Sequence, residues 1–244
     1  MNTVLFDLDG TLLPIDMNEF MEYYIMLLKT RLKFRGYEAD IILPEIFKGV
    51  DIMTNNNGLV TNEVIFWEHM SKLFLTEKGR PSISKRRKFE KEMFKFYDED
   101  FHIIQFFARP DDYAAKCVKL LKDKGYQVIC ATNPLFPRLA TENRIRWAGL
   151  EPGDFDYITT YENSCYTKPN INYYKHLLKM IDKDPKDCIM VGNDVDEDMC
   201  VEKIGMDTYL IDKFILNKHN KDIEKYKKGD FKDLYEYIKD LRSY

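Results

Sequence analysis

Residues 4–11 have the sequence Val4-Leu5-Phe6-Asp7-Leu8-Asp9-Gly10-Thr11. A short apolar run, typical of a buried strand, leads directly into two carboxylates and is ended by a glycine. A buried strand of this kind delivers its acidic residues to an edge of the sheet. We therefore predict that this stretch forms a strand of the central sheet and that Asp7 and Asp9 lie at a functional site.

Strands and helices alternate along the chain from about residue 108 onward. The predicted strands are short, continuous apolar runs over 127–131, 157–161, 188–191 and 208–211, and the predicted helices end near residues 124, 148, 181, 204 and 241. Several of these helices stop at a glycine. The alternation is typical of βαβ units on a parallel sheet covered on both faces. We predict an α/β fold with a doubly wound, Rossmann-like parallel sheet.

A long insertion separates the first strand from the rest of this pattern. Within it, apolar residues such as Phe20, Tyr24 and Leu28 recur at helical spacing. An insertion of about 90 residues is more typical of a domain than of a loop. We predict an α/β core domain made of residues 1–15 and 108–244, and a mainly α-helical cap domain over residues 16–107. The basic run 85–88 is expected to be the solvated face of a helix.

The composition excludes several classes of protein. The chain has 244 residues, of which 45% are hydrophobic and 32% charged, as in ordinary globular proteins. Its net charge of −4 argues against a sequence-independent nucleic-acid binder. No apolar run of about 18 residues predicts a membrane span, and the N-terminus does not resemble a secretory signal. The five cysteines form no C-x-x-C pair and indicate reduced thiols, so we expect a cytoplasmic protein.

Several common site motifs are missing from the sequence. The four histidines have no metal-ligand spacing, which argues against a zinc site. There is no G-x-S-x-G motif of a serine hydrolase. Neither G-x-G-x-x-G nor a Walker A sequence is present, so neither a dinucleotide cofactor nor a P-loop is indicated.

Polar side chains follow the predicted strands at the points where the strands end. Ligands of open parallel sheets bind beyond the carboxyl ends of the strands. The residues expected at this edge are Asp7, Asp9, Thr132, Asn133, Asn193 and Asp194, with Lys168 in a loop before a helix. Grouped carboxylates suit Mg²⁺. A carboxylate can also act as a nucleophile towards phosphorus, a second one as general acid and base, and an ammonium can neutralise the phosphoryl charge.

This set of residues resembles a known family. The sequence Asp7-Leu8-Asp9-Gly10-Thr11 matches the D-x-D-G-T signature of the haloacid dehalogenase-like (HAD) superfamily. Residues 129–133, Lys168-Pro169 and residues 191–198 resemble its second, third and fourth motifs, in the family's order. The resemblance covers the core from residue 4 to about 212. The helical insertion lies where the family, in its phosphoglycolate phosphatase-like branch, has a C1-type cap.

The resemblance implies a role for each matching residue. Asp7 would be the nucleophile and a Mg²⁺ ligand, and Asp9 the general acid and base, with its main-chain carbonyl also at the metal. Thr132 and Asn133 would bind the phosphoryl group, whose charge Lys168 would neutralise. Asp194 would complete the metal site.

The fourth motif departs from the common Gly-Asp pattern, because it has the sequence Gly192-Asn193-Asp194. Either Asn193 or Asp194 could face the metal. We favour Asp194, because a cation needs negative charge and Asp198 then follows at a common spacing of four residues. Asn193 and Asp198 are then expected to lie behind the metal ligands and to support them.

The resulting prediction is a Mg²⁺-dependent phosphatase that hydrolyses a small phosphorylated metabolite through an aspartyl-phosphate, as a monomer or homodimer. One alternative is a phosphomutase or other phosphotransferase of the same superfamily. Another, from a different class, is a phosphorylatable regulatory or binding module, although receiver domains have no D-G-T sequence beside the phospho-acceptor and no cap. A dehalogenase is less expected, because that branch typically lacks the second aspartate.

Overall fold

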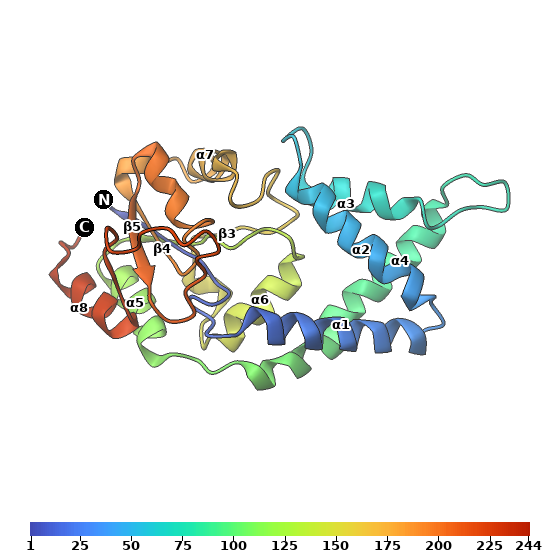
Figure 1. The fold of residues 1–244 in the computed structure, drawn as a ribbon, viewed down its shortest axis with the longest axis horizontal. Coiled ribbons are helices and arrows are strands. Elements are labelled where there is room, and N and C mark those ends of the chain that lie inside the picture. Colours follow the sequence, from blue (N-terminus) through green and yellow to red (C-terminus); the bar gives the residue numbers. More distant parts are fainter.

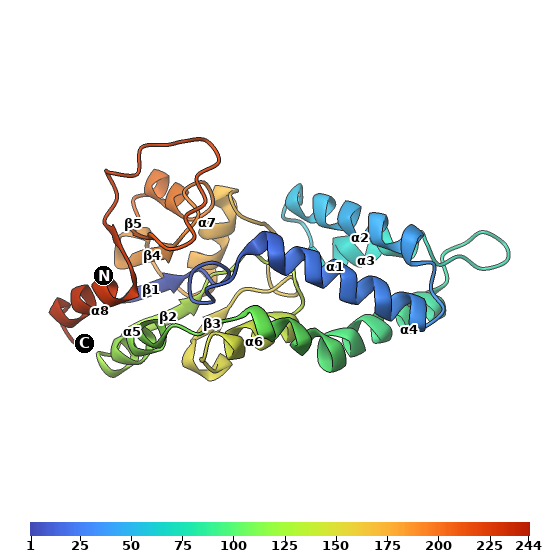
Figure 2. The same ribbon diagram turned by 60° about the horizontal axis from the view of Figure 1, so that its bottom comes forward.

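The computed structural model describes all 244 residues. The molecule is elongated, with an α/β core at one end and a bundle of helices at the other (Figure 1). Both termini lie at the end of the core that is remote from the bundle (Figures 1 and 2). No helix combines the length and the apolar composition that crossing a bilayer requires.

The core is built on one sheet of six parallel strands in the order β3-β2-β1-β4-β5-β6. The strands are β1 (Thr3–Phe6), β2 (Gln127–Cys130), β3 (Tyr157–Ile158), β4 (Cys188–Gly192), β5 (Asp207–Ile211) and β6 (Lys228–Gly229). Strand β1 lies at the centre, where Leu5 is in register with Ile129 of β2 and Met190 of β4. The carboxyl ends of these three strands are therefore aligned.

Helices cover both faces of the sheet, as the alternation of strands and helices predicts. The core helices are α5 (Asp112–Asp123), α6 (Arg138–Trp147), α7 (Ile171–Met180) and α8 (Phe231–Asp240). Val4 and Phe6 belong to the hydrophobic cluster that includes α5 and α8, whereas Leu5 belongs to the cluster that includes α7. Successive residues of a strand point to opposite faces, so β1 is buried on both sides. This confirms the predicted doubly wound α/β fold.

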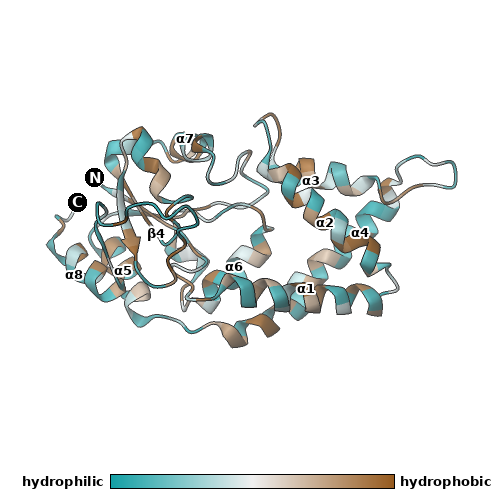
Figure 3. Cartoon of the chain, in the orientation of Figure 1, coloured by the Kyte–Doolittle hydropathy of each residue, from teal (hydrophilic) through white to brown (hydrophobic).

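The insertion between β1 and α5 is helical, as predicted. Its helices are α1 (Met17–Phe34), α2 (Ala39–Thr54), α3 (Asn62–Ser71) and α4 (Ile83–Lys95), followed by a π-helix (Phe96–Asp100) and a 3₁₀ helix (Phe101–Phe107). Hydrophilic and hydrophobic segments recur along each of these helices (Figure 3), as expected for helices with one apolar face. Of the basic run in α4, Lys85, Arg87 and Lys88 are exposed, as expected for a solvated face.

The apolar faces of the insertion continue into the core. One cluster of 46 buried residues contains Phe20 and Leu28 of α1 and Phe89 of α4 together with Val4 and Phe6 of the sheet. The division into domains at residues 15/16 and 107/108 therefore stays a prediction, since the packing is continuous across it.

Two elements of the core differ from the prediction. The helix expected to end near residue 204 is a short 3₁₀ helix, Met199–Ile204. The residues before it form turns because the carboxylate of Asp194 accepts from the main-chain N–H groups of Asp196 and Glu197, which competes with helix formation. Strand β6 was not predicted, because two residues with no apolar alternation give no signal.

The insertion is attached to the core by a buried polar contact as well as by its two chain connections. Asn62, which is fully buried at the start of α3, donates from Nδ2 to the main-chain oxygen of Pro134 at 3.1 Å. Its Oδ1 accepts from Asn56 at 2.8 Å, and its main-chain N–H donates to Ser164. These bonds fix α3 against the loop that follows β2.

Replacing Asn62 by Ala should therefore loosen the insertion on the core. The change leaves the main-chain oxygen of Pro134 without a partner and removes one of the hydrogen bonds of the buried Asn56 amide, which costs about 1–3 kcal/mol of unfolding free energy. Chemical denaturation followed by circular dichroism measures the loss. The matched control is Asn57→Ala, since Asn57 is exposed and its side chain accepts only a local bond from Leu59. Equal losses in the two variants would contradict the anchoring role of Asn62.

Candidate active site

A buried ion cluster lies where strands β1 and β4 end. The ammonium of Lys168 lies 2.8 Å from Oδ1 of Asp7 and 2.6 Å from Oδ1 of Asp198. Asp198 and Lys168 are buried, and Asp7 is 8% exposed. Burial by itself lowers the pKa of Lys168, but Asp198 and Asp7 outweigh this and raise it well above its usual value. The lysine is therefore a permanent cation between two carboxylates.

Asp198 is held in this cluster from several sides. Burial raises the pKa of its carboxyl, and the ammonium of Lys168 acts in the opposite direction. Its Oδ2 accepts from the main-chain N–H of Asp194 at 3.1 Å. A Cβ on Gly192 would lie 2.1 Å from the same oxygen, so only glycine allows β4 to approach the carboxylate this closely. Asp198 thus holds the ammonium of Lys168, and its expected place behind the metal ligands stays a prediction.

Asp9, two residues after Asp7, is paired with a different cationic side chain. One of its oxygens, Oδ2, pairs with Nη1 of Arg144, a residue of α6 that is 1% exposed. The other oxygen, Oδ1, is buried without a hydrogen-bond partner. Burial raises the pKa of Asp9, and Arg144 acts in the opposite direction. The guanidinium also stacks over Phe136, 4.4 Å from the ring centroid, so its place is fixed by packing as well as by charge.

The loop after β2 brings Thr132 and Asn133 to the same edge. Thr132 is 2% exposed, and its main-chain oxygen accepts from the hydroxyls of Thr159 and Tyr173. The amide of Asn133 bonds to the protein, because Nδ2 donates to Glu197 at 3.1 Å and Oδ1 accepts from the main chain of Lys168 at 3.3 Å. The Asn133 side chain thus orients the loop that carries Lys168, while its main-chain N–H donates no bond within the chain.

Asn193 and Asp194 have different surroundings. Oδ1 of Asn193 accepts from the Thr11 hydroxyl at 2.9 Å, and the same hydroxyl lies 3.2 Å from Oδ2 of Asp7. Nδ2 of Asn193 donates to the main chain of Phe214. Oδ1 of Asp194 accepts from Asp196 and Glu197, and no hydrogen bond involves its Oδ2. Both polar atoms of the Asn193 side chain are therefore bonded within the protein, whereas Asp194 keeps Oδ2 free.

The oxygens at this edge fit Mg²⁺. No three acidic, histidine or cysteine side chains converge into a ready-made metal cluster. Mg²⁺ is nevertheless usually held by one or two carboxylates together with water and substrate phosphate, not by a cage of side chains. Asp7 and the unbonded oxygen of Asp194 supply such carboxylates. The main-chain carbonyl of Asp9, which accepts no hydrogen bond within the chain, is a third hard oxygen.

Three residues of the site were not predicted from the sequence. Arg144 gives a signal in retrospect, because it shares a helix face with Ala140, Thr141 and Trp147, all buried. A charged residue on such a face needs a buried partner. Glu197 and Tyr174 gave no signal: Glu197 accepts from Asn133, and the Tyr174 hydroxyl donates to the main chain of Glu197 at 2.8 Å.

Comparisons with known proteins agree with this fold. The family model described as haloacid dehalogenase-like hydrolase matches residues 1–199. A search of curated proteins finds no match. Among solved structures, the chain is similar to a HAD phosphatase from Thermococcus onnurineus, with a TM-score of 0.58, 15% identity, and coverage of 99% of this chain and 100% of the other.

Two further structures show the range of activities among similar folds. One is described as a predicted phosphoglycolate phosphatase from Haemophilus somnus, with a TM-score of 0.56, 16% identity and 97% coverage of both chains. The other is the L-2-haloacid dehalogenase PA0810, with a TM-score of 0.56, 14% identity, and coverage of 99% of this chain and 100% of the other. At these identities the likeness shows the fold, and both a phosphatase and a dehalogenase share it. On the family match over 199 of its 244 residues, the chain belongs to the haloacid dehalogenase-like hydrolases.

Proposed function

We propose that the protein is a Mg²⁺-dependent phosphatase that hydrolyses a small phosphate monoester through an aspartyl-phosphate on Asp7. The observation that supports the proposal is that two neighbouring carboxylates, Asp7 and Asp9, are bonded to different cationic side chains. Asp7 forms an ion pair with the buried ammonium of Lys168. Asp9 forms an ion pair with Arg144 through Oδ2, and its Oδ1 has no hydrogen-bond partner. A nucleophile and a separate general acid are what two-step phosphate hydrolysis needs.

In the first step an oxygen of Asp7 attacks phosphorus, and the bond from phosphorus to the ester oxygen breaks. The leaving oxygen takes a proton from Asp9, whose protonated form is favoured by burial. In the second step Asp9 accepts a proton from water, and the water oxygen attacks phosphorus to release phosphate and restore Asp7. Lys168 and the main-chain N–H of Asn133 stabilise the phosphoryl oxygens. Mg²⁺, when bound, would add positive charge against the same oxygens.

Asp9 also favours a phosphatase over a dehalogenase. A displaced halide ion needs no proton, so a dehalogenase has no use for a general acid at this position, and its branch of the family typically lacks the second aspartate. Here that aspartate is present and is held by a buried arginine. A buried ion pair is costly to form unless its geometry is good, so its presence supports a role for Asp9 in chemistry.

The proposed role of Asp7 as nucleophile can be tested by substitution. Asp7→Asn should reduce hydrolysis of p-nitrophenyl phosphate at saturating Mg²⁺ by at least roughly 10³-fold, because the amide cannot form the phosphoenzyme. The control is Asp207→Asn, an exposed aspartate at the start of β5. Near-normal turnover by Asp7→Asn would exclude Asp7 as the nucleophile. Release of one inorganic phosphate per ester cleaved separates a phosphatase from a phosphomutase.

The proposed requirement for Mg²⁺ can be tested by removing the metal. Removal of Mg²⁺ with EDTA should abolish turnover, and added Mg²⁺ should restore it. Asp194→Asn should raise the Mg²⁺ concentration for half-maximal activity by roughly tenfold or more, because the ligand loses its charge. If Asn193→Ala raised that concentration instead and Asp194→Asn did not, the assignment of the metal ligand would be reversed.

The contribution of Arg144, which pairs with Asp9, can also be tested by substitution. Arg144→Lys keeps the charge but loses the planar fork, so Asp9 should shift from its position and kcat should fall roughly 10- to 100-fold with little change in KM. The matched control is Arg146→Lys on the same helix, where the side chain is 45% exposed and only weakly paired. An unchanged kcat in Arg144→Lys would show that the pair is structural only.

A further inference from the structure

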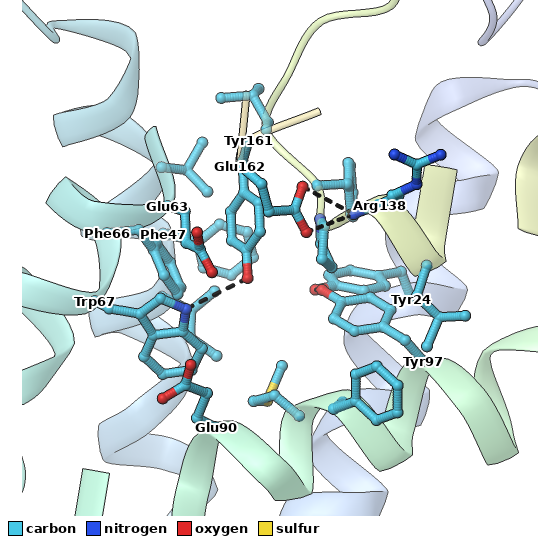
Figure 4. A pocket seen from close by; sticks show the side chains of 18 of the residues that line it. Tyr24, Phe47, Glu63, Phe66, Trp67, Glu90, Tyr97, Arg138, Tyr161 and Glu162 are labelled. Atoms are coloured by element: carbon cyan, nitrogen blue, oxygen red, sulfur yellow. Dashed lines mark hydrogen bonds between the residues drawn. The ribbon is translucent and has the colours of Figure 1, made fainter. Parts of the chain in front are cut away.

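A large cavity lies between the helical insertion and the core. Its volume is about 550 Å³, within the range of small-molecule sites. Helices α1 to α4 form one side, and residues 135–139 and 161–162 of the core form much of the other (Figure 4). None of the proposed reacting residues lines it, because Phe136 of its wall packs against Arg144, and Arg144 pairs with Asp9. A ligand of this cavity would therefore be distinct from the substrate.

The wall of the cavity is mostly apolar and rich in aromatic rings. Sixteen of its 22 residues are hydrophobic, among them Met21, Phe47, Phe66, Met93 and Phe136. Methionine and aromatic side chains form a surface that adapts to flat, apolar ligands. The faces of aromatic rings also attract cations. The wall is therefore suited to an apolar ligand, including one that carries a positive charge.

The charge of the wall is one-sided. Its ionisable side chains, tyrosines apart, are four glutamates and one arginine. The arginine, Arg138, pairs with Glu142 at 2.7 Å, so its charge is already neutralised. Glu63 and Glu162 form no ion pair with any residue of the chain. The cavity thus presents negative charge that the protein does not balance.

The two unpaired carboxylates lie on the same side of the cavity. The main-chain N–H of Glu63, at the start of α3, donates to the main-chain oxygen of Tyr161 at 2.9 Å, which brings Glu63 close to Glu162. Glu162 accepts only from the main-chain N–H of Arg138, at 2.8 and 3.1 Å (Figure 4). The carboxylate of Glu63 accepts no hydrogen bond. Most of the acceptor positions of both groups are therefore open.

These carboxylates disfavour one another's charge. Burial raises the pKa of Glu63, and Glu162 and Glu90 raise it further, while Arg86 acts against them. Glu90 lies 3.5 Å from Arg86, which neutralises part of its charge. A cation between Glu63 and Glu162 would relieve the remaining repulsion.

Buried hydroxyls supply further polar groups. Tyr161 is 9% exposed and points into the cavity, where its oxygen accepts from Nε1 of Trp67 at 3.3 Å and its own proton has no acceptor (Figure 4). The hydroxyls of Tyr24 and Tyr97 are 2.8 Å apart, so one of their two protons also lacks an acceptor. A buried donor without an acceptor is rare in proteins, and one that points into a cavity is available to a ligand.

We propose that this cavity is a small-molecule site, separate from the active site, for an organic ammonium ion with an apolar or aromatic body. The ammonium would lie at Glu63 and Glu162, and the body among the aromatic and methionine side chains. Trp67 follows Glu63 by four residues and so shares its helix face, where its ring would add a cation–π attraction. The proposal does not depend on the phosphatase function.

Three ligands of similar shape test the proposal by calorimetric titration of the intact protein: 4-phenoxybenzylamine, 4-phenoxybenzyl alcohol and 4-phenoxybenzoate. We expect the amine to bind roughly tenfold more tightly than the alcohol, and the benzoate more weakly than either. A partly exposed charge pair and a cation–π contact each contribute a few-fold in affinity. Equal binding of the three ligands, or no binding of the amine, would overturn the proposal.

A matched pair of variants locates the ammonium. Glu63→Gln should weaken binding of the amine roughly five- to tenfold and leave binding of the alcohol unchanged. The control, Glu68→Gln, removes an exposed carboxylate of the same helix that does not line this cavity. If Glu63→Gln weakened both ligands equally, or Glu68→Gln had the same effect on the amine, the proposed contact would be wrong.

A third variant distinguishes the cavity from the active site, whose carboxylates could also attract an amine. Asp7→Asn removes one of those carboxylates and should change the Kd of 4-phenoxybenzylamine by less than about twofold, because Asp7 does not line the cavity. A loss of affinity equal to that of Glu63→Gln would place the amine at the active site and refute a separate site. This measurement needs no catalysis, so its outcome is independent of whether any ester is hydrolysed.

Discussion

The buried ammonium of Lys168 is the constraint around which the site is arranged. A charge without solvent is tolerated only when it is paired, and here the partners come from the ends of two neighbouring strands, Asp7 after β1 and Asp198 after β4. The main chain of Lys168 is held in turn by Asn133 after β2. Residues that follow three strands thus contact Lys168. These contacts fix the distance between Asp7, the proposed nucleophile, and the ammonium that would neutralise the phosphate charge.

Close approach of these elements requires residues without a side chain at two positions. A Cβ on Gly192 would collide with Asp198, and Gly10 has a φ of +81° with its missing Cβ directed at Asn193, 2.5 Å from Nδ2. Glycine adopts this backbone conformation at little cost, whereas other residues are strained in it. The D-x-D-G-T and Gly-Asn-Asp sequences therefore encode packing of the site as well as its chemistry.

The sequence predicted which residues lie at the carboxyl edge of the sheet, because that depends only on the alternation of strands and helices and on where each strand ends. Asp7 and Lys168 are 161 residues apart, yet the alternation of strands and helices indicates that both reach the same edge, and their side chains lie 2.8 Å apart. Arg144 was missed because its helix face indicates only that it is buried, and no spacing identifies its partner Asp9 on a distant loop. The choice between Asn193 and Asp194 depends on side-chain orientation, which spacing does not specify. The roles of these residues in catalysis and metal binding remain predictions.

The segment 132–138 connects the candidate active site with the helical insertion. Its first residues, Thr132 and Asn133, lie at the carboxyl edge of the sheet, whereas Leu135 and Phe136 face the helices of the insertion across a mostly apolar cavity of about 550 Å³. Between them, the main-chain oxygen of Pro134 accepts from Asn62 and so holds the helical insertion in place. Movement of the insertion away from the core must break that bond, and any displacement of the loop is passed on to Lys168 through Asn133. The position of the helical insertion and the position of Lys168 are therefore coupled through this one segment.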